Sequence, residues 1–141
     1  MNCTTIEQSR KLIELGLKPE TADLCYVAVT NKQQPQADSL IVRQNYSFQQ
    51  NDVPAWSVEA LLEAMPQSIH QWDDRERCYK TYELNLFRSY YHCCSYSFGP
   101  SLKEENHDNL ICYGGDTWIE AVYNVVIWCF ENNHIKSNTQ N

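Results

Sequence analysis

The sequence predicts an α+β fold: a mainly antiparallel sheet of about five strands with three helices packed on one face. Apolar and polar residues alternate at Tyr82, Leu84 and Leu86, and again at Tyr96 and Phe98, as they do in half-buried strands. Helical patterns precede, separate and follow the strand patterns. This order is typical of an antiparallel sheet with helices on one face.

The first helix is expected over residues 5–15. Threonines at positions 4 and 5 each stand three residues before a glutamate or glutamine, which is the spacing of a capping box. Gly16 provides a left-handed stop, and residues 19–23 predict one further helical turn that begins with proline.

Two strands are expected next, over residues 24–29 and from residue 40 to about residue 48, with an exposed loop over residues 31–39. Ser57 is positioned to cap a second helix, which Pro66 closes.

The second half begins with an alternately charged turn over residues 73–77. Strands are expected at residues 81–86, at residues 91–98 and at residues 110–113. The connection between the first two of these strands, at residues 88–90, contains no glycine or asparagine, so the sequence does not indicate the geometry of a hairpin there.

The last helix is expected over residues 117–131, after a turn at Gly114 and Gly115 and an N-cap at Asp116. Its polar residues occupy one narrow stripe, and a helix that is apolar almost all round is normally buried. We expect it to lie across the sheet and also to meet another helix or a second subunit.

Size and charge restrict the class of protein. The 141 residues predict one domain over residues 1–134 with a frayed tail at 135–141. A net charge of −7 argues against a nucleic-acid binder. No signal peptide is recognisable, and the apolar stretch 118–130 is shorter than a bilayer requires. We expect a soluble, cytoplasmic protein with no membrane partner.

The seven cysteines are odd in number and include no Cys-x-x-Cys spacing, so most are expected to be buried free thiols. His92 and Cys94 are two residues apart in an expected strand, so their side chains would lie on the same side of it. They are the candidates for a thiol-dependent site. A zinc site would need His92 with Cys78, Cys112 and either Cys93 or Cys94, without the short paired spacings of structural zinc sites. We therefore assign no catalytic, cofactor-binding or metal-ligating residue and expect no cofactor.

Aromatic residues are abundant, with four Trp, nine Tyr and four Phe. Most belong in the core, but an exposed aromatic cluster would mark a surface for a partner. The candidates for such a surface are Trp72, Tyr90, Tyr91 and Trp128.

Several short stretches resemble a family of small uncharacterised proteins of gut bacteria and their phages or mobile elements. The matching stretches are Thr5-Ile6-Glu7-Gln8-Ser9, Leu15-Gly16-Leu17, Thr21-Ala22-Asp23, Pro54-Ala55-Trp56-Ser57, Leu61-Leu62, Met65-Pro66, Glu120-Ala121-Val122, Trp128 and Glu131-Asn132. The resemblance covers somewhat under half the chain and is weakest over residues 67–99. It implies an intracellular accessory protein and transfers no catalytic residue.

The leading hypothesis is therefore a non-enzymatic module that binds another protein, with a homodimer as one form that the interaction could take. Two alternatives remain open. The first is a small thiol- or metal-dependent enzyme that uses the His/Cys cluster. The second is an acidic inhibitor that mimics nucleic acid, which would require the carboxylates to gather on one face.

Overall fold

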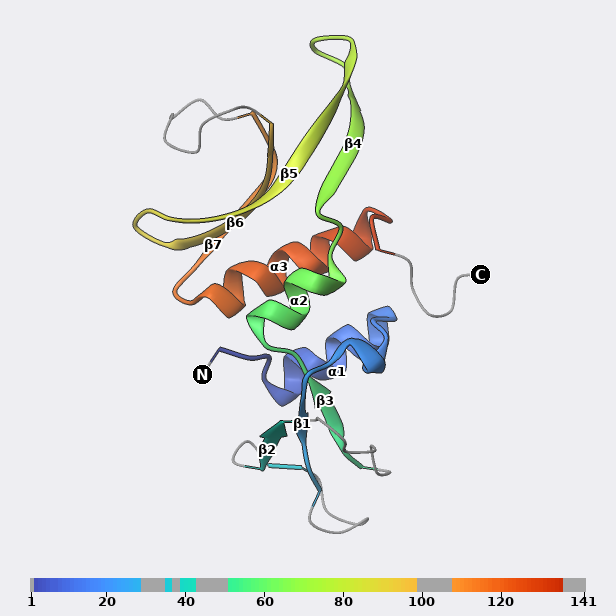
Figure 1. Ribbon diagram of the computed structural model, residues 1–141, viewed down its shortest axis with the longest axis vertical. Coiled ribbons are helices and arrows are strands. Elements are labelled where there is room, and N and C mark those ends of the chain that lie inside the picture. The colour runs from blue at the N-terminus through green and yellow to red at the C-terminus, as the bar shows by residue number, and fades with distance from the viewer. Residues whose placement is uncertain (1, 29–34, 37–38, 43–50, 99–107, 136–141) are drawn as a thin grey trace. The chain divides into compact units, whose positions relative to one another are not determined.

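Figure 1 shows the computed structural model, which describes residues 2–28, 35–36, 39–42, 51–98 and 108–135. These residues form three α-helices, one 3-10 helix and seven strands in two antiparallel sheets. The α+β class is confirmed, but the strands form sheets of three and four rather than one sheet of about five. The chain divides into two compact units, residues 65–134 and the remainder. That residues 1–134 behave as a single domain stays a prediction.

Helix α1 (Ile6–Leu15) of the first unit begins and ends as its sequence predicts. The N–H of Gln8 donates to Thr5 Oγ1 at 3.1 Å, and the N–H of Thr5 donates to Gln8 Oε1 at 3.0 Å. Two N–H groups that a helix start leaves without partners are satisfied in this way. Gly16 ends the helix with φ 105°, a conformation that disfavours a side chain. The expected turn follows as a 3-10 helix, η1 (Pro19–Thr21).

The sheet of the first unit has the order β2-β1-β3. Its strands are β1 (Leu24–Tyr26), β2 (Leu40–Val42) and β3 (Val53–Ala55). Strand β1 ends earlier than the expected residue 29, and β3, which has Pro54 at its centre, was not expected. Residues 43–48 of the expected second strand, and most of the expected loop 31–39, lie outside the described residues.

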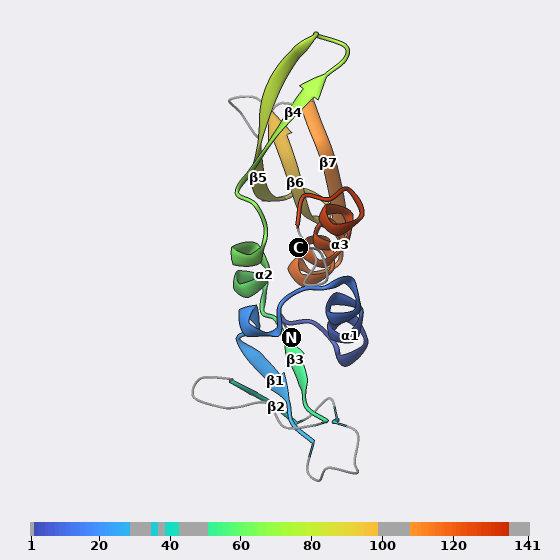
Figure 2. The same ribbon diagram turned by 90° about the vertical axis from the view of Figure 1, so that its right-hand side faces the viewer.

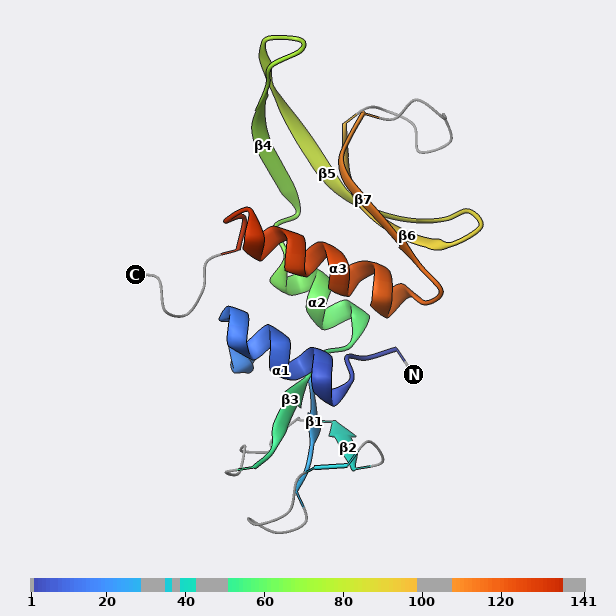
Figure 3. The ribbon, with the colours of Figure 1, turned by 180° about the vertical axis from the view of Figure 1, so that it is seen from behind.

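Hydrogen bonds from side chains connect the helices and strands of the first unit. Helix α2 (Val58–Ala64) starts where expected, with the N–H of Ala60 donating to Ser57 Oγ at 3.1 Å. The side chain of Trp56 is fully buried, and its indole N–H donates to Thr21 Oγ1 at 2.9 Å. Tyr26 donates its hydroxyl to the carbonyl of Thr4 at 2.7 Å. Figure 3 shows β1, β2 and β3 together with α1.

The second unit contains a four-stranded sheet in the order β4-β5-β6-β7. Its strands are β4 (Ser68–Asp73), β5 (Cys78–Arg88), β6 (His92–Phe98) and β7 (Asp108–Gly115). Strand β4 was not expected from the sequence, whereas the turn that follows it was. Figures 1 and 2 show the β4–β5 hairpin extending away from α3 (Trp118–Glu131), the helix of this unit.

Helix α3 contacts strands β6 and β7. Tyr96 on β6 is buried, and its ring centre lies 6.2 Å from that of Trp128 on the helix. The Cys129 thiol lies 3.8 Å from the Tyr96 hydroxyl, which donates to the carbonyl of Pro66 at 2.6 Å. The expected packing of the last helix on the sheet is therefore present within this unit.

The approach to α3 differs from the expected glycine turn and Asp116 cap. Gly114 and Gly115 belong to β7 and pair with Cys93 and His92. A side chain at position 115 would place its Cβ 2.8 Å from the Cβ of Glu120, so the close approach of the helix requires glycine there.

The N-cap of α3 is Thr117, whose hydroxyl accepts from the N–H of Glu120 at 3.2 Å. The Glu120 carboxylate reaches back to the N–H of Asp116 at 2.9 Å. Thr117 and Glu120 have the Thr-x-x-Glu spacing of a capping box, which is the sequence signal that identifies this cap.

Candidate functional site

The β4–β5 hairpin presents two chemically different faces. Side chains of an antiparallel pair alternate between the two sides of the sheet, and directly opposed residues share a side. The register continues from Leu84 to Tyr96, which contacts α3, so the even-numbered residues of β5 lie on the side facing the helix. The opposite side, which we call the aromatic face, carries Ser68, His70, Trp72, Tyr79, Thr81 and Glu83.

Three rings on the aromatic face form a contiguous cluster, His70, Trp72 and Tyr79, which we call the aromatic cluster. Tyr79 stacks on His70, with ring centres 5.1 Å apart and planes inclined by 14°. Trp72 meets Tyr79 edge-on at 5.1 Å and 73°. Trp72 is 46% exposed and Tyr79 is 64% exposed. Exposed aromatic rings in mutual contact offer a ready surface for another molecule.

Hydrogen bonds orient two of the three rings. His70 Nδ1 lies 3.0 Å from the hydroxyl of Thr81, its directly opposed residue. The Trp72 indole N–H donates to Asp74 Oδ1 at 2.9 Å. These two rings are therefore held in place by side-chain hydrogen bonds within the hairpin and its turn.

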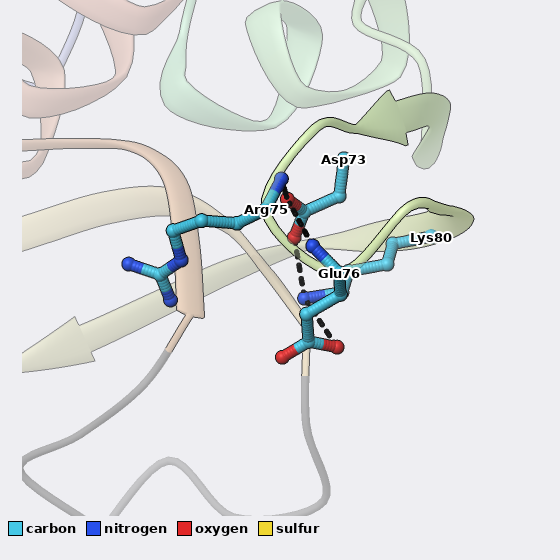
Figure 4. Close-up of polar contacts among 4 residues, drawn as sticks. All are labelled: Asp73, Arg75, Glu76 and Lys80. Carbon is cyan, nitrogen blue, oxygen red and sulfur yellow. Dashed lines mark hydrogen bonds and ion pairs between the residues drawn. The ribbon is translucent and has the colours of Figure 1, made fainter.

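On the other side of the hairpin, Lys80 ties the two strands to the turn. Its side chain is only 3% exposed, and Nζ lies 2.6 Å from Asp73 Oδ2 and 3.2 Å from Glu76 Oε2. The ammonium also lies 5.1 Å from the centre of the Phe98 ring on β6, a cation–π geometry. Figure 4 shows the two carboxylates near the ammonium and the Arg75 guanidinium directed away from them.

The turn is further ordered by Asp73. Its Oδ1 accepts from the N–H groups of Arg75 at 2.8 Å and Glu76 at 3.3 Å. The Lys80 ammonium, aided by these N–H groups, lowers the pKa of the Asp73 carboxyl, although partial burial opposes the change. Arg77 takes a positive φ of 56° and closes the turn. The expected solvated turn is thus held on one side by an ion pair with a buried lysine.

The four candidate surface residues do not form one patch. Trp72 belongs to the aromatic cluster. Tyr90, 97% exposed, and Tyr91 lie at the other end of β5, in the connection to β6. Trp128 on α3 is half-buried and stacks on His134 at 5.0 Å. Because β5 spans residues 78–88, the tyrosines are separated from Trp72 by up to about 33 Å of extended chain.

Sequence reasoning did not select His70, Tyr79 or Lys80. The signal for the rings was a period-2 pattern of aromatic residues, His70 and Trp72, before the turn and Tyr79 after it. That pattern is weak because the alternate positions, Ile69 and Gln71, are not both apolar. No local signal indicates that Lys80 is buried.

The histidine and cysteine of the proposed thiol site share a face but lack a catalytic geometry. The His92 ring packs edge-on against Trp118, with ring centres 4.7 Å apart. Cys94 is fully buried, and burial raises its thiol pKa to about 12. A thiol of this kind is protonated at neutral pH and is a poor nucleophile.

All seven cysteines are free thiols, and most are buried as expected: Cys3, Cys25, Cys94 and Cys129. The proposed zinc ligands do not converge. His92 and Cys112 lie on opposite sides of the sheet, because His92 pairs with Gly115 whereas Cys112 pairs with Ser95, and Cys78 begins β5 at the far end from His92. Cys112 lies near Cys93, on the same side of the sheet, and burial together with Cys93 raises the Cys112 pKa. Among the described residues, no group of three His, Cys, Asp or Glu side chains could hold a metal ion.

Comparisons with protein-family models, with curated proteins and with solved structures give no match. In the part of the chain that the structure describes, no helix is long and apolar enough to cross a membrane. The site can therefore be described only from its own geometry. It is an exposed aromatic surface on a hairpin that a buried ion pair stabilises.

Proposed function

We propose that the protein is a cytoplasmic, non-enzymatic accessory protein that works by binding another protein, and that the aromatic cluster is the centre of the contact surface. The observation that carries this proposal is the mutual contact of three exposed rings on one hairpin face. Tryptophan and tyrosine are enriched among the residues that dominate binding free energies.

The support beneath the cluster favours binding. Lys80, Asp73 and Glu76 connect the strands and the turn from the opposite side, so the rings rest on an ordered hairpin. A preordered surface gives up less conformational entropy than a mobile one when a partner docks.

The biological setting is part of the proposal. The resemblance to small proteins of gut bacteria and their phages or mobile elements agrees with an accessory role. If the partner is a second copy of the chain, the protein forms a homodimer. The resemblance supplies no reaction, and the high pKa of Cys94 adds no support for a thiol enzyme.

Photo-crosslinking tests the proposal. Tyr79 is replaced by benzoylphenylalanine in the organism that encodes the chain, and Tyr90 is replaced in a matched control because it is also exposed but lies at the other end of β5. We expect a discrete adduct from position 79 that disappears when Trp72→Ala is added. Equal adducts from both positions, or none from position 79, would contradict the proposal.

A further inference from the structure

Strand β4 is the edge strand of the four-stranded sheet. The pattern of hydrogen bonds between β4 and β5 shows which main-chain N–H and C=O groups of β4 point away from β5. The N–H of Leu84 donates to the carbonyl of Gln67 at 2.9 Å, so these opposed residues form a hydrogen-bonded pair. Such pairs alternate along an antiparallel ladder. Ile69, Gln71 and Asp73 therefore bond to β5, and the main-chain groups of Ser68, His70 and Trp72 point away from it.

These outward groups have no partner in the described part of the chain. The strand also lacks the usual edge protection, because residues 68–72 include no proline, no lysine and no carboxylate. The other edge, β7, differs: its pairing with β6 shifts register near Tyr96 and Ser97, and it ends in two glycines. Strand β4 is thus the better template for an added strand.

On the two strands, the aromatic face beside this edge carries one charged side chain, the carboxylate of Glu83, and the adjoining turn contributes Asp74. Asp74 accepts the Trp72 indole N–H at one end of the cluster, and exposed Glu83 stands opposite Ser68 at the other. Arg75 and Arg77 are exposed in the same turn as Asp74, but no lysine or arginine belongs to the aromatic face of the two strands themselves. Flat rings bounded by carboxylates favour a cationic side chain, through cation–π and charge interactions.

We infer that β4 binds an extended basic peptide segment of a partner as a fifth, antiparallel strand. Residues of the segment opposed to Ser68, His70 and Trp72 exchange main-chain hydrogen bonds with them, and their side chains lie on the aromatic face. Lysine or arginine opposite His70 and Trp72 contacts the rings of the aromatic cluster. This inference rests on the proposed function and adds the conformation and chemistry of the partner.

A defined peptide tests the strand pairing. The probe is an acetylated, amidated heptapeptide that alternates valine and lysine, with lysine at its three even positions, titrated into the full-length chain. Amide NMR shifts at Ser68, His70 and Trp72 locate the peptide, and fluorescence anisotropy gives the Kd. We expect saturable binding that weakens when glutamate replaces lysine. No saturable binding up to about 1 mM, or equal binding of the glutamate peptide, overturns the inference.

Methylation of the peptide nitrogens separates strand pairing from charge. N-methylation of the lysines removes the N–H groups that face β4, whereas N-methylation of the internal valines removes N–H groups that face outward. Both peptides keep the same net charge. We expect the first to lose binding and the second to retain it. Equal affinities of the two methylated peptides would exclude addition to the edge.

A proline variant makes the same test from the protein side. Ser68→Pro removes an outward N–H and leaves the ladder to β5 intact, as an edge strand permits, and Ser68→Ala is the matched control that keeps the N–H. We expect the proline variant to bind the heptapeptide about 3- to 10-fold more weakly than the alanine variant. Equal affinity of the two variants contradicts the inference, provided that their amide spectra show the same folded hairpin.

Two further outcomes separate this inference from the proposed function. If Trp72→Ala abolishes the crosslink from position 79 but Ser68→Pro does not change it, the aromatic surface is correct and strand addition is wrong. If the chain dimerises in light scattering and Ser68→Pro makes it monomeric, a second copy occupies the edge and the basic-peptide partner is wrong.

Discussion

Lys80 Nζ lies 2.6 Å from the Asp73 carboxylate, although the lysine side chain is almost fully buried. A buried ammonium without a carboxylate partner would be strongly unfavourable. Asp73 and Glu76 therefore make the burial of Lys80 possible, and the lysine in turn fixes the turn that follows β4. The aromatic cluster lies on the opposite side of the same strands, so the ion pair and the exposed rings share one scaffold.

Substitution of Lys80 separates its hydrocarbon stem from its charge. Lys80→Met keeps most of the buried stem and removes the charge, whereas Lys80→Ala removes both. We expect Lys80→Ala to lower the free energy of unfolding by about 2 kcal/mol more than Lys80→Met does, because alanine lacks the two further carbons and the sulfur with which methionine fills the buried space. Urea unfolding monitored by circular dichroism measures the difference. Equal stabilities of the two variants would show that the stem contributes no packing.

The Asp73 carboxyl makes stability depend on pH. Its pKa is lowered in the folded chain by Lys80, below its value of 3.8 in the absence of such partners. A lowered folded-state pKa means that the stabilisation is fully present above the unfolded-state pKa and is lost as pH falls through the folded-state pKa. We therefore expect Asp73→Asn to be less stable than the parent chain at pH 7, with the difference shrinking below about pH 4. Thermal unfolding across pH 2–7 tests this, and a difference that grows at low pH would be of the wrong sign.

The aromatic cluster should contribute more to binding than to folding. Trp72 and Tyr79 are exposed, and a cross-strand aromatic pair contributes about 0.2–1 kcal/mol to sheet stability. We expect Tyr79→Ala to lower the free energy of unfolding by no more than about 1 kcal/mol. Trp56→Ala, at a fully buried tryptophan, should lower it by about 3–5 kcal/mol. Chemical denaturation of both variants provides the comparison, and a large loss in Tyr79→Ala would assign the cluster a structural role.

The elements that the sequence predicts well are those with local chemical signals. Thr5 and Gln8 have the capping-box spacing, and Gly16 adopts the left-handed conformation that it was expected to provide. The alternation along Tyr82, Leu84 and Leu86 identifies β5 because one side of that strand faces a helix. In each case, residues within a few positions of one another determine the local structure.

The features that the sequence does not predict depend on distant partners. Apolar and polar residues alternate only weakly along β4. Only its pairing with β5 shows on which side of the sheet each of its side chains lies. From the sequence alone, Lys80 is expected at the surface. Its burial depends on its contacts with Phe98, Asp73 and Glu76, which only the structure shows. Trp72 could be selected because it stands beside a charged turn, whereas Tyr79 and His70 gain their role only through the register that aligns the three rings.

Thiol reactivity distinguishes the proposed binding protein from the alternative enzyme. Cys94 and Cys129 are buried, and burial raises their pKa values to about 12 and about 11. At pH 8, a thiol of pKa 12 is ionised in only about one molecule in ten thousand, and the thiolate is the reacting form. We therefore expect iodoacetamide to modify Cys78, Cys93 and Cys112, which are exposed or half-exposed, well before Cys94.

Peptide mass spectrometry of the alkylated chain over time measures the rate at each cysteine. Unfolding in guanidinium is the control, because it should make all seven thiols react at similar rates. A thiol-dependent enzyme that uses His92 and Cys94 needs a reactive thiolate at Cys94 in the folded chain. Alkylation of Cys94 as fast as that of exposed Cys78 would therefore replace the binding hypothesis with the enzymatic one, whereas slow alkylation is the result that the binding hypothesis predicts.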